Sequence, residues 1–310
     1  MAISSWFREE IKNLVRARAY SKGGYLDGTM IKGESSAGTV KFPVSGGRLK
    51  MYELSGGLNA VPSSNISLDM VSLLTRDYEA SHWIKKFDEA RMGPSMRAAI
   101  ADGLAAAQRR KKDQLKLDAL NAFAGATSTL TDGPNTVTTI GDGTSRVDIL
   151  NCIDATDQLA GAGSDAEVYW AIPNVWFSQL MMYKEFSQNV YLGNTDLPFM
   201  SNKKLKIKTF NSVHIMAIPD EHFIYGTGGF VEGTPGFTGT GYLDTFMWTE
   251  RSVGCEIWSD IENMSLSQHE EMEGSPALGK VQLSGAAIGL LPEEVKRVRM
   301  LAIKNAIRVA

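Results

Sequence analysis

Alternating apolar and polar residues near the beginning of the chain form its clearest pattern. Apolar residues alternate with other residues at Val40, Phe42 and Val44 before a Ser45–Gly47 turn and at Leu49 and Met51 after it, and Leu54 follows. A period of two is typical of strands, and Gly46 and Gly47 supply the positive φ angles of a tight hairpin. The pattern predicts a two-stranded hairpin at an exposed edge, since Pro43 cannot donate to a ladder. An extended hairpin of this kind cannot bury its own apolar face, which comprises Val40, Phe42, Val44, Leu49, Met51 and Leu54.

Two more extended runs follow, at 66–70 and 75–80, and then the period changes to that of a helix. Pro94 and Ser95 form a helix start. No proline interrupts the Ala-rich run from there to Phe123, so we expect one helix over 94–123 with a length of roughly 40 Å. Its apolar stripe is interrupted by Lys111, and Gly103 costs about 1 kcal/mol relative to alanine unless something packs closely there.

An amphipathic helix is predicted at 3–20. Phe7, Ile11 and Leu14 lie on its apolar stripe, and charged residues occupy the other face. A Gly/Ser-rich stretch from Gly28 to Gly38 separates it from the hairpin. A single amphipathic helix is only marginally stable in water, so its stripe must dock on something.

The second half of the chain alternates helix and strand patterns. Helices are expected at 145–159 and 173–183, and strands at 166–172, 205–210 and 213–218. Residues 246–258 are expected to form one long strand. The period of 294–309 favours neither state. Residues 125–145 are predicted to be a loop or a weak hairpin, and 226–241 a surface loop. The fold class is α+β with a compact mixed region.

Composition places the chain in the ordinary globular class, with 43% hydrophobic and 22% charged residues among 310. A net charge of −3 gives no strong field toward nucleic acid or anionic membranes. No apolar run reaches the roughly 20 residues of a membrane span, and no secretory signal is expected. Cys152 and Cys255 are expected to be buried thiols in a reducing cytoplasm.

The sequence contains no recognisable catalytic or metal-binding motif. The four histidines have no partner at a metal-ligand spacing, and neither a nucleophile elbow nor a phosphate loop is present. Asp220–His222 is expected to be a turn of solvated charge, and Asp154 and Asp157 a solvated helix face. We therefore expect no enzyme activity, no catalytic residue, no metal and no cofactor.

The order of these elements resembles the major capsid proteins of tailed bacteriophages, which have the Hong Kong 97 fold. The resemblance covers nearly the whole chain and rests on element order, because that family has no catalytic motif. It implies an α+β capsid fold with five regions. These are an N-terminal arm at 1–37, an E-loop with its return strand at 38–80, a P-domain at 81–144 with the spine helix at 94–123, a mixed α/β A-domain at 145–245, and return strands at 246–310.

The resemblance implies an icosahedral head built from hexamers and pentamers of this chain around double-stranded DNA. Contacts between subunits are expected from the hairpin residues Val40, Phe42, Val44, Leu49, Met51 and Leu54, and from the arm residues Phe7, Ile11 and Leu14. Further expected partners are scaffolding and portal proteins and a decoration protein, without a membrane. The implied location is the virion, after assembly in the host cytoplasm.

The basic run Arg109, Arg110, Lys111 and Lys112 has two interpretations. It is either a solvated helix face or a surface that meets packaged DNA without sequence specificity. Some relatives weld their subunits through a Lys–Asn bond, for which Lys41 and Lys50 are candidate donors here, but no acceptor asparagine can be aligned. Two other structural functions stay open at this point, an encapsulin-type shell that encloses cargo and a tail subunit.

Overall fold

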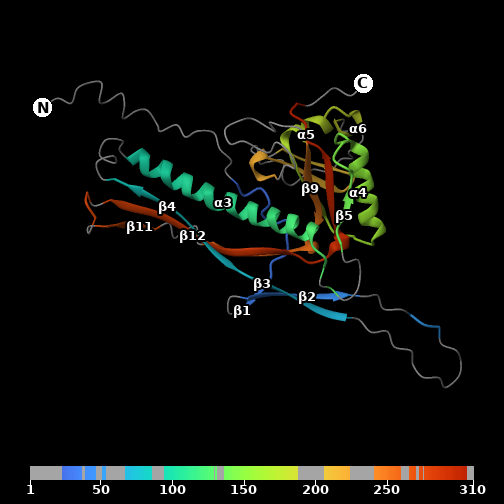
Figure 1. The fold of residues 1–310 in the computed structure, drawn as a ribbon, viewed down its shortest axis with the longest axis horizontal. Helices are drawn as coiled ribbons and strands as arrows, with labels where there is room; N and C mark the ends of the chain where they lie inside the picture. The colour runs from blue at the N-terminus through green and yellow to red at the C-terminus, as the bar shows by residue number, and fades with distance from the viewer. Residues whose placement is uncertain are drawn as a thin grey trace, which may run out of the picture. The chain divides into compact units, whose positions relative to one another are not determined.

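The computed structural model divides the chain into two compact units, and Figure 1 labels its elements. Unit 1 draws on Met1–Leu26, Thr75–Leu115 and Glu256–Ala286, and unit 2 on Asp27–Leu74, Lys116–Cys255 and Ala287–Ala310. The residues that the structure describes are 23–36, 39–46, 51–53, 67–85, 94–128, 130, 136–187, 206–223, 241–259, 265–269, 272–274 and 276–305.

The predicted long helix is confirmed as α3, which runs without interruption over Pro94–Gly125. Its 32 residues correspond to about 48 Å. The helix has two buried flanks instead of one apolar stripe, and several of its buried residues are polar. They are Leu104, Ala106, Gln108, Asp113, Lys116, Leu117 and Leu120.

In unit 1, helix α3 lies along a sheet built around β12. The strands are β4 (Arg76–Ile84), β10 (Val253–Ser259), β11 (Ser265–Gln268) and β12 (Ala277–Gly289). Strand β10 belongs to unit 1 from Glu256 onward, and β12 as far as Ala286. Strands β4 and β12 pair antiparallel, with Ile84 opposite Ala277 and Arg76 opposite Gly285. Alternate residues of β12 are buried, because one face packs against α3, where Leu104 lies over Gly279.

Unit 2 contains a six-stranded sheet in the order β5-β13-β9-β6-β8-β7. Its strands are β5 (Thr138–Ile140), β6 (Val168–Pro173), β7 (Lys206–Phe210), β8 (Val213–Ile218), β9 (Tyr242–Thr249) and β13 (Val295–Leu301). The helices α4 (Ile149–Gly161), α5 (Asn174–Leu180) and α6 (Lys184–Ser187) also belong to this unit. All six residues of β6 are buried, and the fully buried tryptophans 170, 176 and 248 form the centre of the core.

Two sequence predictions in this region need correction. The single strand expected over 246–258 is two strands, β9 and β10, that belong to different sheets. A turn of 3-10 helix at Glu250–Ser252 separates them, and the Ser252 hydroxyl donates to the Thr249 carbonyl oxygen at 2.8 Å. The segment 125–145, predicted to be a loop or a weak hairpin, contains one strand, β5. The C-terminal run, whose period favoured neither helix nor strand, contains β13, which pairs parallel with β5.

The predicted hairpin also differs from the structure. Strand β2 (Thr39–Gly46) lies between β1 (Glu34–Ser36) and β3 (Ser67–Leu74) and pairs antiparallel with both. Its main partner is therefore the run predicted at 66–70, and residues 51–53 are not in a strand. The rest of the predicted second strand, 48–50 and 54, and Gly47 of the predicted turn lie outside the described residues.

Pro43 was predicted to lie at an edge of the sheet, and it does so although β2 as a whole lies between two strands. Strand β1 pairs with Thr39–Lys41, so among the described residues β2 has a single neighbouring strand, β3, at Pro43. Since proline cannot donate a backbone hydrogen bond, it fits a position where one side of the strand is unpaired.

Candidate assembly surfaces

The ribbon formed by β2 and β3 has one covered face and one open face. The covered face comprises Val40, Phe42 and Val44 of β2 together with Leu73 of β3, all of them buried. The ring of Phe42 packs so closely on Gly254 that a Cβ there would lie 2.5 Å from it. This face of the ribbon is therefore covered by other residues of the same chain.

The open face carries a row of exposed apolar side chains on β3. Leu68, Met70 and Leu74 expose 83%, 60% and 74% of their surface. In the strand register Met70 lies opposite Pro43 and Leu68 opposite Ser45, both exposed. We call this set, Pro43, Leu68, Met70 and Leu74, the outer row. Apolar residues at this spacing and exposure are typical of a surface that another protein covers.

Some of the predicted contact residues of the hairpin are buried, one is exposed, and the others lie outside the described residues. Val40, Phe42 and Val44 were expected to stay uncovered in a single chain, which is wrong, because they are buried within it. Met51 is fully exposed. Leu49 and Leu54 lie outside the described residues, as do the arm residues Phe7, Ile11 and Leu14. The sequence analysis did not select the outer row, although Leu68 and Met70 are in the alternating run that it identified.

The four basic residues of α3 do not share one surface. Arg109 is exposed, whereas Arg110, Lys111 and Lys112 are half-buried. Lys111 extends over the ring of Tyr78, with its Nζ atom 4.5 Å from the ring centroid. Consecutive helical residues are rotated by about 100°, so a run of four surrounds the helix instead of lining one face.

Near this run, helix α3 binds the first described residues of the chain. The fully buried carboxylate of Asp113 accepts the backbone N–H of Tyr25 at 3.0 Å and that of Leu26 at 3.2 Å. Lys116 donates to Asp27 at 2.9 Å. Neither Asp113 nor Lys116 was predicted to take part in such a contact, because a charged residue in a basic helical run is usually solvated. The sequence feature that could have indicated this contact is Gly23–Gly24, which ends the predicted N-terminal helix next to the residues that bind α3.

The sheet of unit 1 borders a cavity. The cavity, of about 810 Å³, is lined by residues of β4, β10 and β12, among them the carboxylates Asp77 and Glu79 and the half-exposed Trp258. Glu79 accepts the Gln282 amide at 2.8 Å. At the far end of β4, Trp83 stacks edge-on against His269 at 5.1 Å between centroids. This part of the sheet thus carries both aromatic and acidic side chains.

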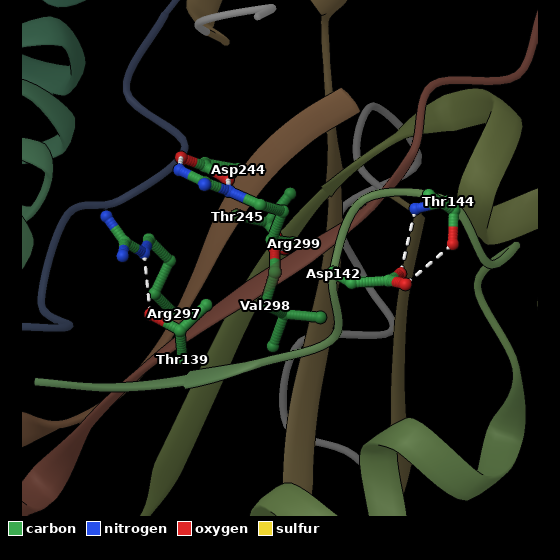
Figure 2. A network of polar contacts seen from close by, with 8 residues as sticks. All are labelled: Thr139, Asp142, Thr144, Asp244, Thr245, Arg297, Val298 and Arg299. Atoms are coloured by element: carbon green, nitrogen blue, oxygen red, sulfur yellow. Dashed lines mark hydrogen bonds and ion pairs between the residues drawn. The ribbon is translucent and has the colours of Figure 1, made fainter. Parts of the chain in front are cut away.

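A polar network holds one edge of the six-stranded sheet in register (Figure 2). Arg299 donates two hydrogen bonds of 2.7 Å to the carboxylate of Asp244, which raises the pKa of Arg299. Arg297 donates to Thr139 across the β13–β5 pair at 2.9 Å. Asp142 accepts the backbone N–H and the hydroxyl of Thr144, and these bonds lower the pKa of Asp142. Each of these contacts joins neighbouring strands or closes a turn, so the network has a structural role.

The Asp220–His222 segment is not the solvated turn that the sequence predicted. His222 is 7% exposed, and its Nε2 lies 3.6 Å from Glu221. Burial raises the pKa of Asp220, whose Oδ1 is buried without a hydrogen-bond partner in the described part of the chain. The prediction for α4 is confirmed, since Asp154 and Asp157 are both exposed.

The described residues contain no group of three or more His, Cys, Asp or Glu residues arranged to hold a metal. Cys152 and Cys255 are buried free thiols, as predicted, and burial raises the pKa of Cys152 to about 12. Within the same residues, no helix is both long enough and apolar enough to span a bilayer.

Comparison with known proteins gives a family match over nearly the whole length. A sequence model described as phage capsid protein matches residues 3–301. No curated protein matches the chain.

Solved capsid structures share the fold at low sequence identity. The capsid of the cyanophage P-SCSP1u aligns with a TM-score of 0.60 at 13% identity, over 92% of this chain and 90% of the other. The mature capsid of bacteriophage PhiM1 gives 0.61 at 13%, over 93% and 90%. The capsid of Ralstonia phage GP4 gives 0.61 at 10%, over 94% of each chain.

Proposed function

This chain belongs to the phage capsid protein family and is a major capsid protein, the subunit that forms the head. From this premise we propose how its surfaces build the shell. Copies associate as hexamers and pentamers through the ribbon, and the closed icosahedral shell holds double-stranded DNA. Scaffolding and portal proteins assist assembly in the host cytoplasm, and a decoration protein can bind the finished head. The virion is its final location.

The observation that carries this proposal is the outer row. Three large apolar side chains on one strand are more than half exposed in a single chain, while the opposite face of the same ribbon is buried. A neighbouring subunit that covers a few hundred Å² of this surface gains several kcal/mol at about 25 cal/mol per Å². Repetition of such a contact around a closed shell makes modest individual bonds strong collectively.

We expect Met70→Glu and Leu68→Glu to prevent shell assembly while leaving the subunit folded. The new carboxylate is solvated in a single chain, but a neighbour that covers it must desolvate a charge without a partner. Electron microscopy and sedimentation of the expressed protein measure assembly, and circular dichroism measures folding.

Leu150→Glu is the matched control, because Leu150 is a comparably exposed leucine on α4, far along the sequence from the ribbon. It should form shells like the unchanged protein. Normal icosahedral shells from both ribbon variants would refute the role of the outer row, and helical tubes from the unchanged protein would indicate a tail subunit instead.

The expected domain assignment and the arm contacts through Phe7, Ile11 and Leu14 remain part of the proposal, as do contacts through Leu49, Met51 and Leu54. Full exposure of Met51 supports its inclusion. We no longer assign contacts to Val40, Phe42 and Val44, because covering them again from outside would require the ribbon to leave its own chain.

A further inference from the structure

The start of the described chain is attached to the middle of α3 by a buried carboxylate. Both oxygens of Asp113 are used, Oδ2 by the backbone N–H of Tyr25 and Oδ1 by that of Leu26. The carboxylate and the side chain of Leu26 are both fully buried. A carboxylate that accepts two backbone N–H groups makes charge-assisted bonds, which are shorter and stronger than neutral ones.

The backbone at Gly23 is adapted to the same contact. Its φ is +67°, in the region that favours glycine, and a Cβ there would lie 2.3 Å from the backbone nitrogen of Arg110. The chain therefore touches the helix backbone directly two residues before Tyr25. Lys116, one turn beyond Asp113, is 5% exposed and donates to Asp27.

We propose that Asp113 is an anchor that fixes residues 23–26 on α3 and thereby sets the point from which the proposed contacts of the N-terminal arm start. Gly23 permits the close approach, and Asp113 fixes the register by binding two consecutive N–H groups. The inference rests on the proposed function, in which the N-terminal arm contacts a neighbour. An arm can reach the same place on every neighbour only if it starts from the same place on every subunit. Asp113 is thus a positioning residue, and it does not itself contact the neighbour.

Amide hydrogen exchange on the unassembled, full-length chain tests the anchor directly. In Asp113→Ala, the N–H groups of Tyr25 and Leu26 should exchange at least about tenfold faster, because the carboxylate that accepts both of them is lost. Asp102→Asn is the control, since Asp102 is an exposed carboxylate on the same helix and should leave that exchange unchanged. Equal exchange in Asp113→Ala and the unchanged protein would overturn the proposal.

A pair of glycine variants tests the close approach independently of charge. Gly23 and Gly28 both have positive φ, but a Cβ at Gly28 meets nothing within 4 Å. Gly23→Ala should therefore accelerate exchange at Tyr25 and Leu26, and Gly28→Ala should not. Similar exchange rates in the two variants would show that backbone strain alone determines the exchange. That result would contradict a close contact between Gly23 and α3.

Assembly of the same variants separates the anchor from the proposed function. We expect Asp113→Ala subunits with accelerated exchange to give shells of irregular size, while Asp102→Asn gives regular ones. Accelerated exchange with regular shells would overturn the positioning role and leave the capsid function intact. If the unchanged protein formed no shells under any condition, the proposed function would fail, whatever the exchange result.

Discussion

At the scale of single residues, several polar side chains inside the described core have specific structural partners. Asp113 binds the start of the described chain, Arg299 pairs with Asp244, and the Trp170 indole N–H donates to Thr245 at 3.0 Å in the buried sheet. A buried polar group is tolerated when it is hydrogen-bonded and is costly when it is not. Asp220 differs from these residues, because its buried Oδ1 has no hydrogen-bond partner among the described residues.

Asp220→Asn should therefore raise the free energy of unfolding at pH 7, by up to about 1 kcal/mol. Burial raises the pKa of Asp220 in the folded state above its ordinary 3.8, so the folded protein binds this proton more tightly than the unfolded chain. Stability from this group is then present at low pH and is lost as the pH rises from the unfolded pKa through the folded pKa. Denaturant unfolding at several pH values measures this slope, which should be smaller in the variant.

Asp154→Asn is the control for this prediction, because Asp154 is exposed on α4. It should change neither the stability at pH 7 nor the slope. A loss of stability in Asp220→Asn at pH 7 would mean that the ionised carboxylate has a partner that stabilises the fold.

At the scale of elements, α3 shows how two kinds of packing share one helix. Leu104 and Lys111 face β12 and β4, while Asp113 faces the first described residues of the chain. An apolar stripe alone predicts only the first of these contacts. The second requires polar residues at buried helix positions, which weakens the amphipathic pattern that a sequence analysis depends on.

Gly103→Ala should stabilise the subunit by about 1 kcal/mol, since alanine has the higher helix propensity. A Cβ at Gly103 meets nothing within 4 Å, so no neighbour opposes the change. Gly289→Ala is the contrasting variant, because a Cβ there would lie 2.1 Å from the ring of Phe123. Thermal unfolding should show a higher Tm for the first and a lower Tm for the second; a lower Tm for Gly103→Ala would show that a close contact requires glycine there.

At the scale of the whole molecule, the charge of the chain bears on its contact with packaged DNA. A net charge of −3 gives no general attraction to DNA, so a contact must come from a local basic surface. In the run at 109–112 only Arg109 is exposed, and Lys111 is held over Tyr78. The proposed DNA-facing surface is therefore narrower than the sequence predicted.

We expect Arg109→Glu to form shells of normal size but to reduce the fraction filled with DNA severalfold, because each lost phosphate contact weakens binding in a salt-dependent way. Filled and empty heads are counted by density-gradient sedimentation after infection. Arg146→Glu, a charge reversal at an exposed arginine of unit 2, should fill normally. Normal filling in the Arg109 variant would show that its helix face is simply solvated.

Sequence alone determined the elements whose signals are local. The helix at 94–125 follows from its alanine content and its freedom from proline, and the buried strand β6 from its continuous apolar run. Element order was also sufficient for the capsid resemblance, because the order survives when sequence identity falls to 10–13%.

Tertiary structure decided which strands pair and which faces are covered. An alternating strand has two faces, and nothing within β2 tells that Phe42 meets Gly254 while Pro43 and Met70 stay open. The partner of β2 begins 21 residues after its end, and Asp113 binds backbone groups 87 and 88 residues away. Such contacts depend on the path of the whole chain, which local periodicity does not contain.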